Sequence, residues 1–395
     1  MTGKPISVLL MCSKHKQDNS IIKAIKDMPF NVSVCTSREE AMLVLESVKL
    51  EIVITEYQLD DSNGVDFLQS VFDKVRMSTR IIVGEKANEE LIIKAVIKGI
   101  ACTYIDEAAQ KGLIKRKLED IARIRSTMTN TKLMEILRGS PDFPINMAVY
   151  EQLMEAMHDD LPIPVISRII SKDVALTAKV LQVANSAFYG NFSGSSIEKA
   201  IIYMGLNPVK DIVLMHSLST NLKMTAAQNK ELESIVRHSI VTNYYMHAIA
   251  KKTGGCPITP LNNSSGIIHD IGKLVQLVFF PMEYNSIVEY RDEHPDDDYY
   301  TCETETHNMS IGHSEIGAYF LRCWNFNQFS IEAALFHHEP EQSSEDVRGC
   351  VEMLFLANTI ADIRDGYNLS LDEALERCTK IKLDKSDMLT ILPPI

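Results

Sequence analysis

The stretch from residue 171 to residue 206, SKDVALTAKVLQVANSAFYGNFSGSSIEKAIIYMGL, constrains the fold of this chain more than any other. Apolar residues recur at helical spacing after Asp173, a residue type that commonly caps a helix N-terminus. Ser195 and Glu198 then have the spacing of a capping box that opens a second helix, and Gly205 is placed to end it. Short helices joined by tight, glycine-marked turns predict a compact helical bundle.

The bundle would place the polar residues Asn185, Ser186 and Tyr189 at a helix end, where backbone groups lack helical partners. The string from Asn185 to Gly190, preceded by Asp173 and followed by Met-Gly-Leu, resembles the signature of HDOD domains, an all-helical branch related to HD-type metal phosphohydrolases. The signature positions are Asp173, Asn185, Ser186, Tyr189 and Gly190. The resemblance covers roughly residues 141–345 and implies a regulatory domain that acts through protein contacts.

Residues 1–125 have a different pattern, in which short apolar runs alternate with amphipathic stretches. This alternation predicts a doubly wound α/β domain with a parallel sheet covered on both faces. The predicted strands are Ile6–Met11, Val32–Cys35, Ile52–Thr55, Ile81–Val83 and Cys102–Ile105. The predicted helices include Glu39–Val48, opened by a capping box of Thr36 and Glu39, and Glu89–Ile97.

The order of these segments resembles a receiver domain of response regulators, which is flavodoxin-like. The resemblance places Glu56 at the phosphoacceptor aspartate, Met11 and Cys12 at the acidic pair, Gly84 at the hydroxyl residue and Glu107 at the lysine. Without the acidic pair we expect no magnesium ion in this domain and no phosphorylation. Glu56 is interpreted either as a mimic of a charged acceptor or, as we favour, as a surface glutamate on a fold kept for protein contacts.

Between these regions, residues 126–140 are predicted to form a helical linker. Its apolar residues are interrupted near Ser126–Thr131, which indicates a break or hinge, and Gly139-Ser140-Pro141 would end it. The predicted organisation is therefore a receiver-like domain at 1–125, the linker at 126–140, and an HDOD domain with a helical C-terminal tail at 141–395.

The histidines of the helical region are the residues that could carry chemistry. Imidazole and carboxylate groups are suitable ligands for zinc, iron, manganese or nickel. Lys273 follows the His-Asp pair by one helical turn, within reach of a bound phosphate. The resemblance to HD-type hydrolases carries the role of metal ligand to His238, His269, Asp270, His313, His337 and His338.

Two departures from the hydrolase pattern bear on activity. The late aspartate ligand is replaced by Asn358, a neutral and weaker ligand, and Asp362 could substitute only if the helix is rotated or shifted. No Gly-Tyr-Pro follows His337-His338. A structural role, in which each histidine is a hydrogen-bonded core residue that holds helices together, therefore competes with metal binding, and we assign no catalytic residue. If the domain is active, His269, Asp270 and Lys273 would carry the reaction.

Charge and cysteine usage limit the partners and the compartment. The net charge of −13 is uneven: residues 1–125 carry +1 and residues 126–395 carry −14. The acidic part disfavours nucleic acid and anionic membranes as partners. The eight cysteines are scattered without a CxxC pair, which predicts reduced thiols. No apolar run approaches the roughly 20 residues of a membrane helix. We therefore expect a cytoplasmic location.

The sequence thus favours a non-enzymatic, bacterial-type signal-transduction protein, in which a receiver-like domain that is not phosphorylated is coupled to an HDOD interaction module. The expected partners are other signalling proteins, such as a kinase, a cyclic-dinucleotide enzyme or a transcription regulator, and a homodimer is also open. The alternative is a metal-dependent phosphohydrolase or cyclic-dinucleotide phosphodiesterase using His269 and Asp270.

Overall fold

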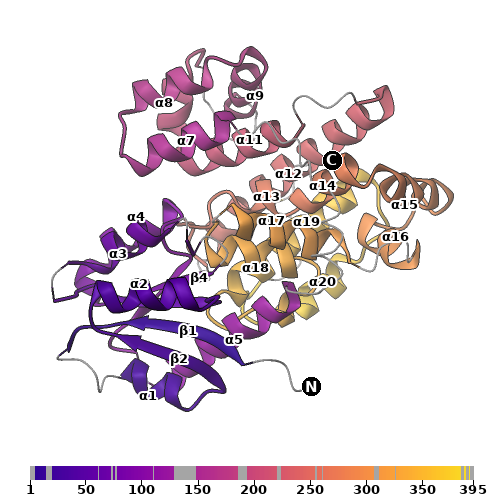
Figure 1. Ribbon diagram of the computed structural model, residues 1–395. Helices are drawn as coiled ribbons and strands as arrows, with labels where there is room; N and C mark the ends of the chain where they lie inside the picture. The colour runs from indigo at the N-terminus through magenta and orange to yellow at the C-terminus, as the bar shows by residue number, and fades with distance from the viewer. Residues whose placement is uncertain are drawn as a thin grey trace. The chain divides into compact units, whose positions relative to one another are not determined.

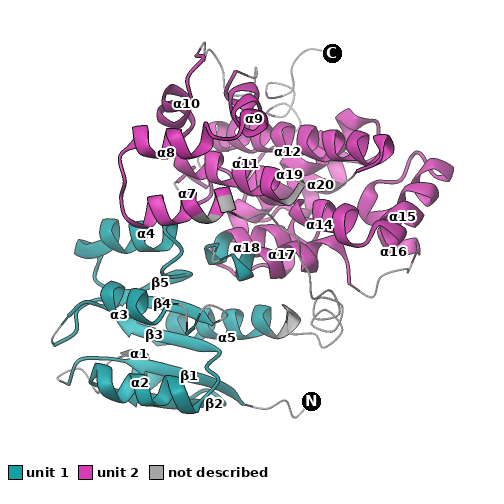
Figure 2. Ribbon diagram, turned by 45° about the horizontal axis from the view of Figure 1, so that its top comes forward, with its two compact units in different colours: residues 1–129, 321–329 teal, residues 130–320, 330–395 magenta. Residues whose placement is uncertain are grey.

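The computed structural model divides into two compact units, which Figure 2 shows in different colours. Unit 1 comprises residues 1–129 together with residues 321–329, and unit 2 comprises residues 130–320 and 330–395. The residues that the structure describes are 5–14, 20–60, 62–72, 74–75, 78–109, 111–128, 148–185, 194–219, 224–253, 256–259, 261–306, 311–324, 326–383, 387 and 391.

Unit 1 contains a five-stranded parallel sheet with the strand order β2-β1-β3-β4-β5 (Figure 1). This is the order of flavodoxin-like doubly wound sheets, so the predicted fold class is confirmed. The strands are β1 (Ile6–Met11), β2 (Phe30–Cys35), β3 (Ile52–Glu56), β4 (Thr79–Gly84) and β5 (Thr103–Asp106). The helices are α1 (Ser20–Lys26), α2 (Arg38–Ser47), α3 (Gly64–Val71), α4 (Glu89–Ile97) and α5 (Lys111–Met128).

Burial explains why these strands can be read from the sequence. Every residue of β3 and β4 is buried, as expected for central parallel strands covered on both faces, and such strands appear as continuous apolar runs. On one face, α1 and α5 contribute Ile21, Ile25, Ile114 and Leu118 to a core shared with the strands. The amphipathic pattern of both helices follows from this packing.

Glu56 differs from its predicted surface position. It ends β3 with only 1% of its area exposed, and its Oε2 accepts a hydrogen bond of 3.0 Å from the backbone amide of Ser13. Asp60 Oδ2 likewise accepts from the amide of Lys14 at 3.0 Å. Burial without a hydrogen bond would be costly for a carboxylate, so this contact explains how Glu56 is accommodated. The carboxylate therefore joins the end of β3 directly to the segment after β1.

Unit 2 is entirely helical in the part of the chain that the structure describes, which confirms the predicted all-α class. Its first helices are α7 (Ala148–His158), α8 (Ile163–Ile170), α9 (Val174–Ala184), α10 (Ile197–Met204), α11 (Leu206–Ser219), α12 (Ala226–Thr253) and α13 (Ser265–Ile268). They are followed by α14 (Ile271–Phe279), α15 (Pro281–Glu293), α16 (Tyr299–Thr306), α17 (His313–Cys323), α18 (Gln328–Phe336), α19 (Arg348–Asp365) and α20 (Leu371–Arg377).

The predicted signature is described in part. Asp173 caps α9, because its Oδ1 accepts from the amide of Leu176 at 2.9 Å. Asn185 lies at the C-cap of the same helix, where its amide donates to the carbonyls of Leu181 and Gly194 at 2.8 and 3.0 Å. The remaining signature positions, Ser186, Tyr189 and Gly190, lie outside the described residues, as do residues 129–147 of the linker region.

Two predicted caps are wrong by one residue. The cap of α2 is Ser37, whose hydroxyl accepts from the amide of Glu40 at 3.3 Å, and the cap of α10 is Ser196, which accepts from the amide of Lys199 at 3.2 Å. In each case two hydroxyl residues are adjacent, so the sequence pattern alone fits both registers.

The prediction of reduced thiols throughout is also wrong. Cys256 and Cys350 form a disulfide with their Cα atoms 5.4 Å apart, within the usual range. The two cysteines are 94 positions apart in the sequence, so no local motif indicates their pairing. The bond connects the segment after α12 to the start of α19. The other six cysteines, all of them described by the structure, form no disulfide.

Candidate metal centre

The predicted His-Asp pair lies at a sharp turn between two helices of unit 2. His269 ends α13, and Asp270 immediately precedes α14; the two side chains are 0% and 1% exposed. A Cβ atom at Gly272 would lie 1.8 Å from the carbonyl oxygen of His313. Only glycine therefore allows the first turn of α14 to contact the start of α17 at this distance. That contact brings His313 next to Asp270.

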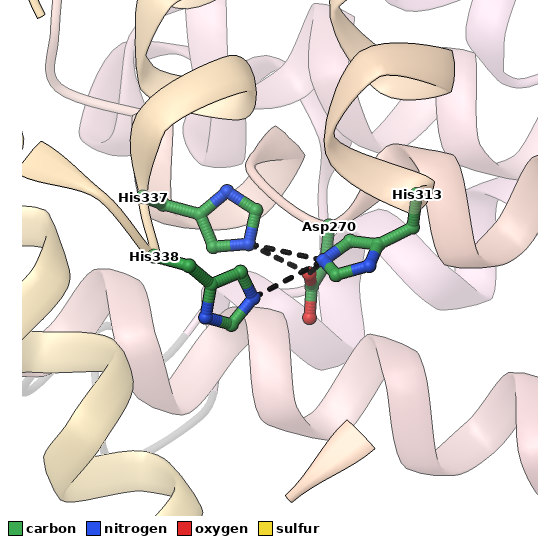
Figure 3. A group of neighbouring side chains, drawn as sticks. All are labelled: Asp270, His313, His337 and His338. Atoms are coloured by element: carbon green, nitrogen blue, oxygen red, sulfur yellow. Dashed lines mark hydrogen bonds and ion pairs between the residues drawn. The ribbon is translucent and has the colours of Figure 1, made fainter. Parts of the chain in front are cut away.

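One group of candidate ligands, here called the three-histidine group, consists of Asp270, His313, His337 and His338. Figure 3 shows the three imidazoles turned toward the Asp270 carboxylate. Asp270 Oδ1 lies 3.4 Å from His313 Nε2 and 3.3 Å from His337 Nε2. His313 Nε2 in turn lies 3.3 Å from His337 Nε2 and 3.2 Å from His338 Nε2. Nitrogen and oxygen atoms from three parts of the chain thus converge on a common centre.

The other ring nitrogens determine what these converging atoms can do. The Nδ1 of His337 faces the carbonyl oxygen of Ala334 at 2.8 Å, and a carbonyl can only accept, so Nδ1 carries the proton. The Nδ1 of His313 faces the Glu303 carboxylate at 2.8 Å and donates to it. In neutral imidazoles the Nε2 atoms then present lone pairs. A proton on one Nε2 would satisfy a single contact between two of these ligand atoms. A metal cation would instead accept electron pairs from the three Nε2 atoms and from Asp270 Oδ1.

The surroundings of Asp270 Oδ1 also favour a bound cation. It is buried, and among the described residues no group donates to it with hydrogen-bonding geometry. Buried polar atoms are normally satisfied, and an exception often marks an ion or water. Three imidazole nitrogens and one carboxylate oxygen form a donor set suited to zinc and to other divalent transition metals. The residues of the three-histidine group therefore fit a metal ion.

The second group, here called the amide group, consists of His238, His269, Asp270 and Asn358. The Nε2 atoms of His238 and His269 lie 2.8 and 2.9 Å from Asn358 Oδ1. They lie 3.7 and 3.4 Å from Asp270 Oδ2. Asp270 thus directs one oxygen to each group. This shared carboxylate connects the two candidate positions.

Asp362 does not replace the missing aspartate ligand. Asn358 Nδ2 donates to Asp362 Oδ2 at 2.8 Å, which fixes the orientation of the amide, because only its nitrogen can donate to a carboxylate. The amide oxygen is consequently held toward His238 and His269. Both Asn358 and Asp362 are buried on α19, one helical turn apart. The amide oxygen of Asn358, and not the carboxylate of Asp362, therefore occupies the position expected for the late aspartate ligand.

Carboxylates outside the two groups orient their histidines. Asp365 Oδ2 lies 3.1 Å from His238 Nδ1, and Glu303 accepts from both the Nδ1 and the backbone amide of His313. Gln276 donates to the same Glu303 carboxylate at 2.5 Å. Such partners fix the tautomer and direction of metal-ligating histidines. The sequence gives no indication of these roles, because neither Glu303 nor Asp365 lies in a recognisable motif with its histidine.

Lys273 lies against Asp270. Its Nζ donates to Asp270 Oδ2 at 2.7 Å and sits 4.8 Å from the centre of the Tyr299 ring. The side chain is 9% exposed. Lys273, which the sequence predicts to lie within reach of a bound phosphate, therefore forms a buried ion pair with Asp270 Oδ2, the oxygen that faces the amide group.

The electrostatics favour ligands in their metal-binding forms. Burial lowers the pKa of His337 to about 3 and that of His338 well below its usual value, so both are neutral near pH 7. Burial opposes ionisation of Asp270, but His269 and Lys273 outweigh it and hold the pKa of that carboxyl well below its usual range. His337 and His338 therefore offer neutral imidazoles, and Asp270 offers a negative charge.

All six predicted ligand candidates are brought together by the fold, in two groups that share Asp270. Among the described residues, no helix is long and apolar enough to cross a membrane. The molecule thus combines an N-terminal parallel α/β unit with a helical unit that gathers histidine and aspartate side chains. The model of the HDOD domain matches residues 143–340, half of the chain, and the chain belongs to the HDOD family.

Individual proteins resemble the chain more distantly. An uncharacterized protein of Treponema pallidum (strain Nichols) is 23% identical over 262 residues, which are 66% of this chain and 49% of the relative, so the match spans about half of that protein. An HDOD domain protein of Geobacter sulfurreducens, of known structure, is 20% identical with a TM-score of 0.47, covering 66% of this chain and 96% of that one. The receiver domain of an HD domain-containing protein of Pseudomonas fluorescens Pf-5 is 17% identical with a TM-score of 0.30, covering 32% and 93%.

Proposed function

We propose that this protein is a non-enzymatic signalling protein, in which an HDOD interaction module that holds a divalent metal ion is coupled to a receiver-like domain that is not phosphorylated. The observation that carries the proposal is the three-histidine group: converging lone pairs inside the domain, with Asp270 1% and His313 and His337 0% exposed. An ion held there would be enclosed by protein, as in structural metal sites.

The ion would act on the conformation of unit 2. Its ligands come from the α13–α14 turn, the start of α17 and the segment after α18, so binding would cross-link three elements that are separate in the sequence. Because the unfolded chain has no such preformed site, metal binding would stabilise the folded domain. A metal-dependent shape is suited to a module that is recognised by other proteins.

The α/β unit supports the signalling half of the proposal. The position expected for the phosphoacceptor is held by Glu56, whose carboxylate is buried on the backbone amide of Ser13. We propose that this domain acts by protein contact without phosphoryl transfer. The proposed partners are other signalling proteins, such as a kinase, a cyclic-dinucleotide enzyme or a transcription regulator. The net charge of −14 over residues 126–395 disfavours nucleic acid as the partner.

A metal-dependent phosphohydrolase is the second candidate. Two groups of ligands that share one carboxylate are also the arrangement of two-metal hydrolases. Lys273, held on the shared Asp270, would place a positive charge beside a phosphate. In that case the chain's own residues would bind the ions, orient the phosphate and stabilise its charge, and the ions would supply an activated water.

Both candidate functions require a bound metal ion, so the metal content of the purified protein tests this shared requirement. Protein purified without chelator or nickel resin would be measured by elemental mass spectrometry, beside Asp270→Ala and, as a matched control, His294→Ala, which removes an exposed histidine. We expect bound metal in the native and His294→Ala proteins and little in Asp270→Ala. We also expect a chelator to lower the melting temperature of the first two proteins. Metal-free native protein would contradict the proposal.

Turnover separates the two candidates. The metal-loaded protein would be assayed with bis(p-nitrophenyl) phosphate and with cyclic dinucleotides, with Asp270→Ala as the background. The proposal expects equal rates from the two proteins. Metal-dependent hydrolysis that Asp270→Ala loses would instead establish the phosphohydrolase.

A further inference from the structure

The two ligand groups around Asp270 are unequal in charge. Each receives one oxygen of the same carboxylate, but only the oxygen directed at the amide group also carries an ion pair, with the ammonium of Lys273. Lys273 Nζ lies 2.7 Å from Asp270 Oδ2, the carboxylate oxygen that faces the Nε2 atoms of both His238 and His269. A divalent ion in the amide group would therefore share its single anionic ligand with a lysine.

Asn358 adds to this inequality. Its amide oxygen lies 2.8 and 2.9 Å from His238 and His269, in the place where a carboxylate would supply a negative charge. Asp362, one turn further along α19, accepts from the amide nitrogen of Asn358 at 2.8 Å through Oδ2. Its Oδ1 lies 3.7 Å from His238 Nδ1, not from the Nε2 that faces Asn358. The negative charge is thus present in the helix, but one turn away from the position where it could bind an ion.

A second ion would also be repelled by the first. Metal ions that share a carboxylate in two-metal sites are roughly 3.5–4 Å apart, a distance at which two divalent charges need anionic ligands between and around them. Among the described residues, Asp270 alone is a member of both groups. Within the part of the chain that the structure describes, no second carboxylate faces the Nε2 atoms of His238 and His269 to offset this repulsion.

We infer that Asn358 restricts the domain to a single tightly bound divalent ion, held by the three-histidine group. The amide group then serves as a hydrogen-bonded support that holds Asp270 and the two histidines in position. This inference rests on the proposed metal binding, and it identifies the residue that sets the number of ions.

The chain offers a matched exchange to test this assignment. Asn358→Asp alone would place a carboxylate against Asp362, so we combine it with Asp362→Asn. The double variant keeps the net charge and the hydrogen bond between the two positions, with donor and acceptor reversed, and moves the carboxylate to the ligand position. Asp362→Asn alone is the control, because it leaves the amide oxygen of Asn358 in place.

The readout is the number of ions per chain, measured by elemental mass spectrometry after equilibration with zinc and removal of free metal. We expect one ion in the native protein, one in Asp362→Asn and two in the double variant, with retained folding checked by circular dichroism. The affinity for the second ion should increase at least about tenfold, measured by competition with a chromophoric chelator. Asn358→Asp alone is a second route to the same gain if the double variant does not fold.

Two ions in the native protein would overturn the inference, as would one ion in folded variants that carry Asn358→Asp. These outcomes differ from failure of the proposed function, which is a native protein without metal. If the native protein holds no metal, the same variants still test the role of Asn358. An ion bound only by the variants that carry Asn358→Asp would support that role, and folded variants without a bound ion would refute it.

Discussion

Asp270 directs its two oxygens to different groups, and this division organises the site at the residue scale. Oδ1 faces His313 and His337, and Oδ2 faces His238, His269 and Lys273. Removing the carboxylate would leave the Lys273 ammonium buried without its partner, in addition to removing a ligand. Loss of stability from Asp270→Ala therefore has two sources, and a smaller perturbation is needed to isolate the metal.

Glu303→Gln is such a perturbation. Glu303 is not a member of either group, but it holds His313 through two hydrogen bonds. Neutralising it weakens the basicity and the orientation of the imidazole, and we expect roughly 10–100-fold lower metal affinity. Chelator competition measures the effect, and Glu305→Gln, exposed on the same helix, is the control. Equal affinities of both variants would show that Glu303 has no part in metal binding.

Asp211 predicts a pH dependence that is separate from the metal. Burial raises its pKa to about 6, against which Lys210 at 3.8 Å acts only in part. Because the folded-state pKa lies above the unfolded value, the folded protein binds the proton more tightly. This contribution to stability is complete below about pH 4 and is lost as the pH rises through 6.

Asp211→Asn should therefore remove a gain in the free energy of unfolding of roughly 2–3 kcal/mol between pH 7 and pH 4. Urea denaturation at a series of pH values measures this difference. Asp292→Asn, an exposed carboxyl on α15, should leave the pH profile unchanged. Parallel profiles for the native protein and Asp211→Asn would exclude a raised pKa.

At the scale of the elements, α9 depends on its first residue. Asp173 accepts from the amide of Leu176 and also lies 3.2 Å from His216 Nε2 on α11. Asp173→Ala should cost roughly 1–2 kcal/mol of unfolding free energy, and Asp173→Asn, which can still cap, should cost less. Chemical denaturation of both variants tests the order. A larger loss for Asp173→Asn would show that the contact with His216, not the cap, dominates.

The elements of the α/β unit could be predicted closely from the sequence, for a physical reason. Central parallel strands are buried on both faces and appear as apolar runs, so β1 has the predicted bounds and β3 and β4 differ from them by one or two residues. Tertiary facts could not be predicted in this way. Burial of Glu56 and the pairing of Cys256 with Cys350 depend on distant parts of the chain meeting.

The candidate site shows the same limit. The histidines stand in short motifs that predict ligands, and the fold gathers all six candidates. The orientation of the Asn358 amide is set by Asp362, and that of His238 by Asp365 more than a hundred residues away. The sequence shows which residue types are present, but the direction in which these side chains point depends on contacts within α19 and on the packing of α12 against α19.

At the scale of the whole molecule, the α/β unit should remain unphosphorylated. In the receiver-like domain that we propose, Glu56 stands at the position of the aspartate nucleophile, and Met11 and Cys12 stand at the positions of the magnesium ligands. Phosphoryl transfer would then lack its main charge stabilisation. We expect the intact mass of the chain to stay unchanged after incubation with acetyl phosphate and magnesium. A reactive receiver protein is the positive control. A phosphoryl group found on residue 56 would refute this prediction.

The close contact at Gly272 has a consequence for variation in this chain. Any other residue there would place a carbon atom 1.8 Å from the carbonyl of His313 and push the first turn of α17 away from Asp270. A genetic screen for loss of metal should therefore recover substitutions at a position that possesses no donor atom. The close approach of two backbone segments is thus as necessary to the proposed site as its ligands, and it is encoded by the absence of a side chain.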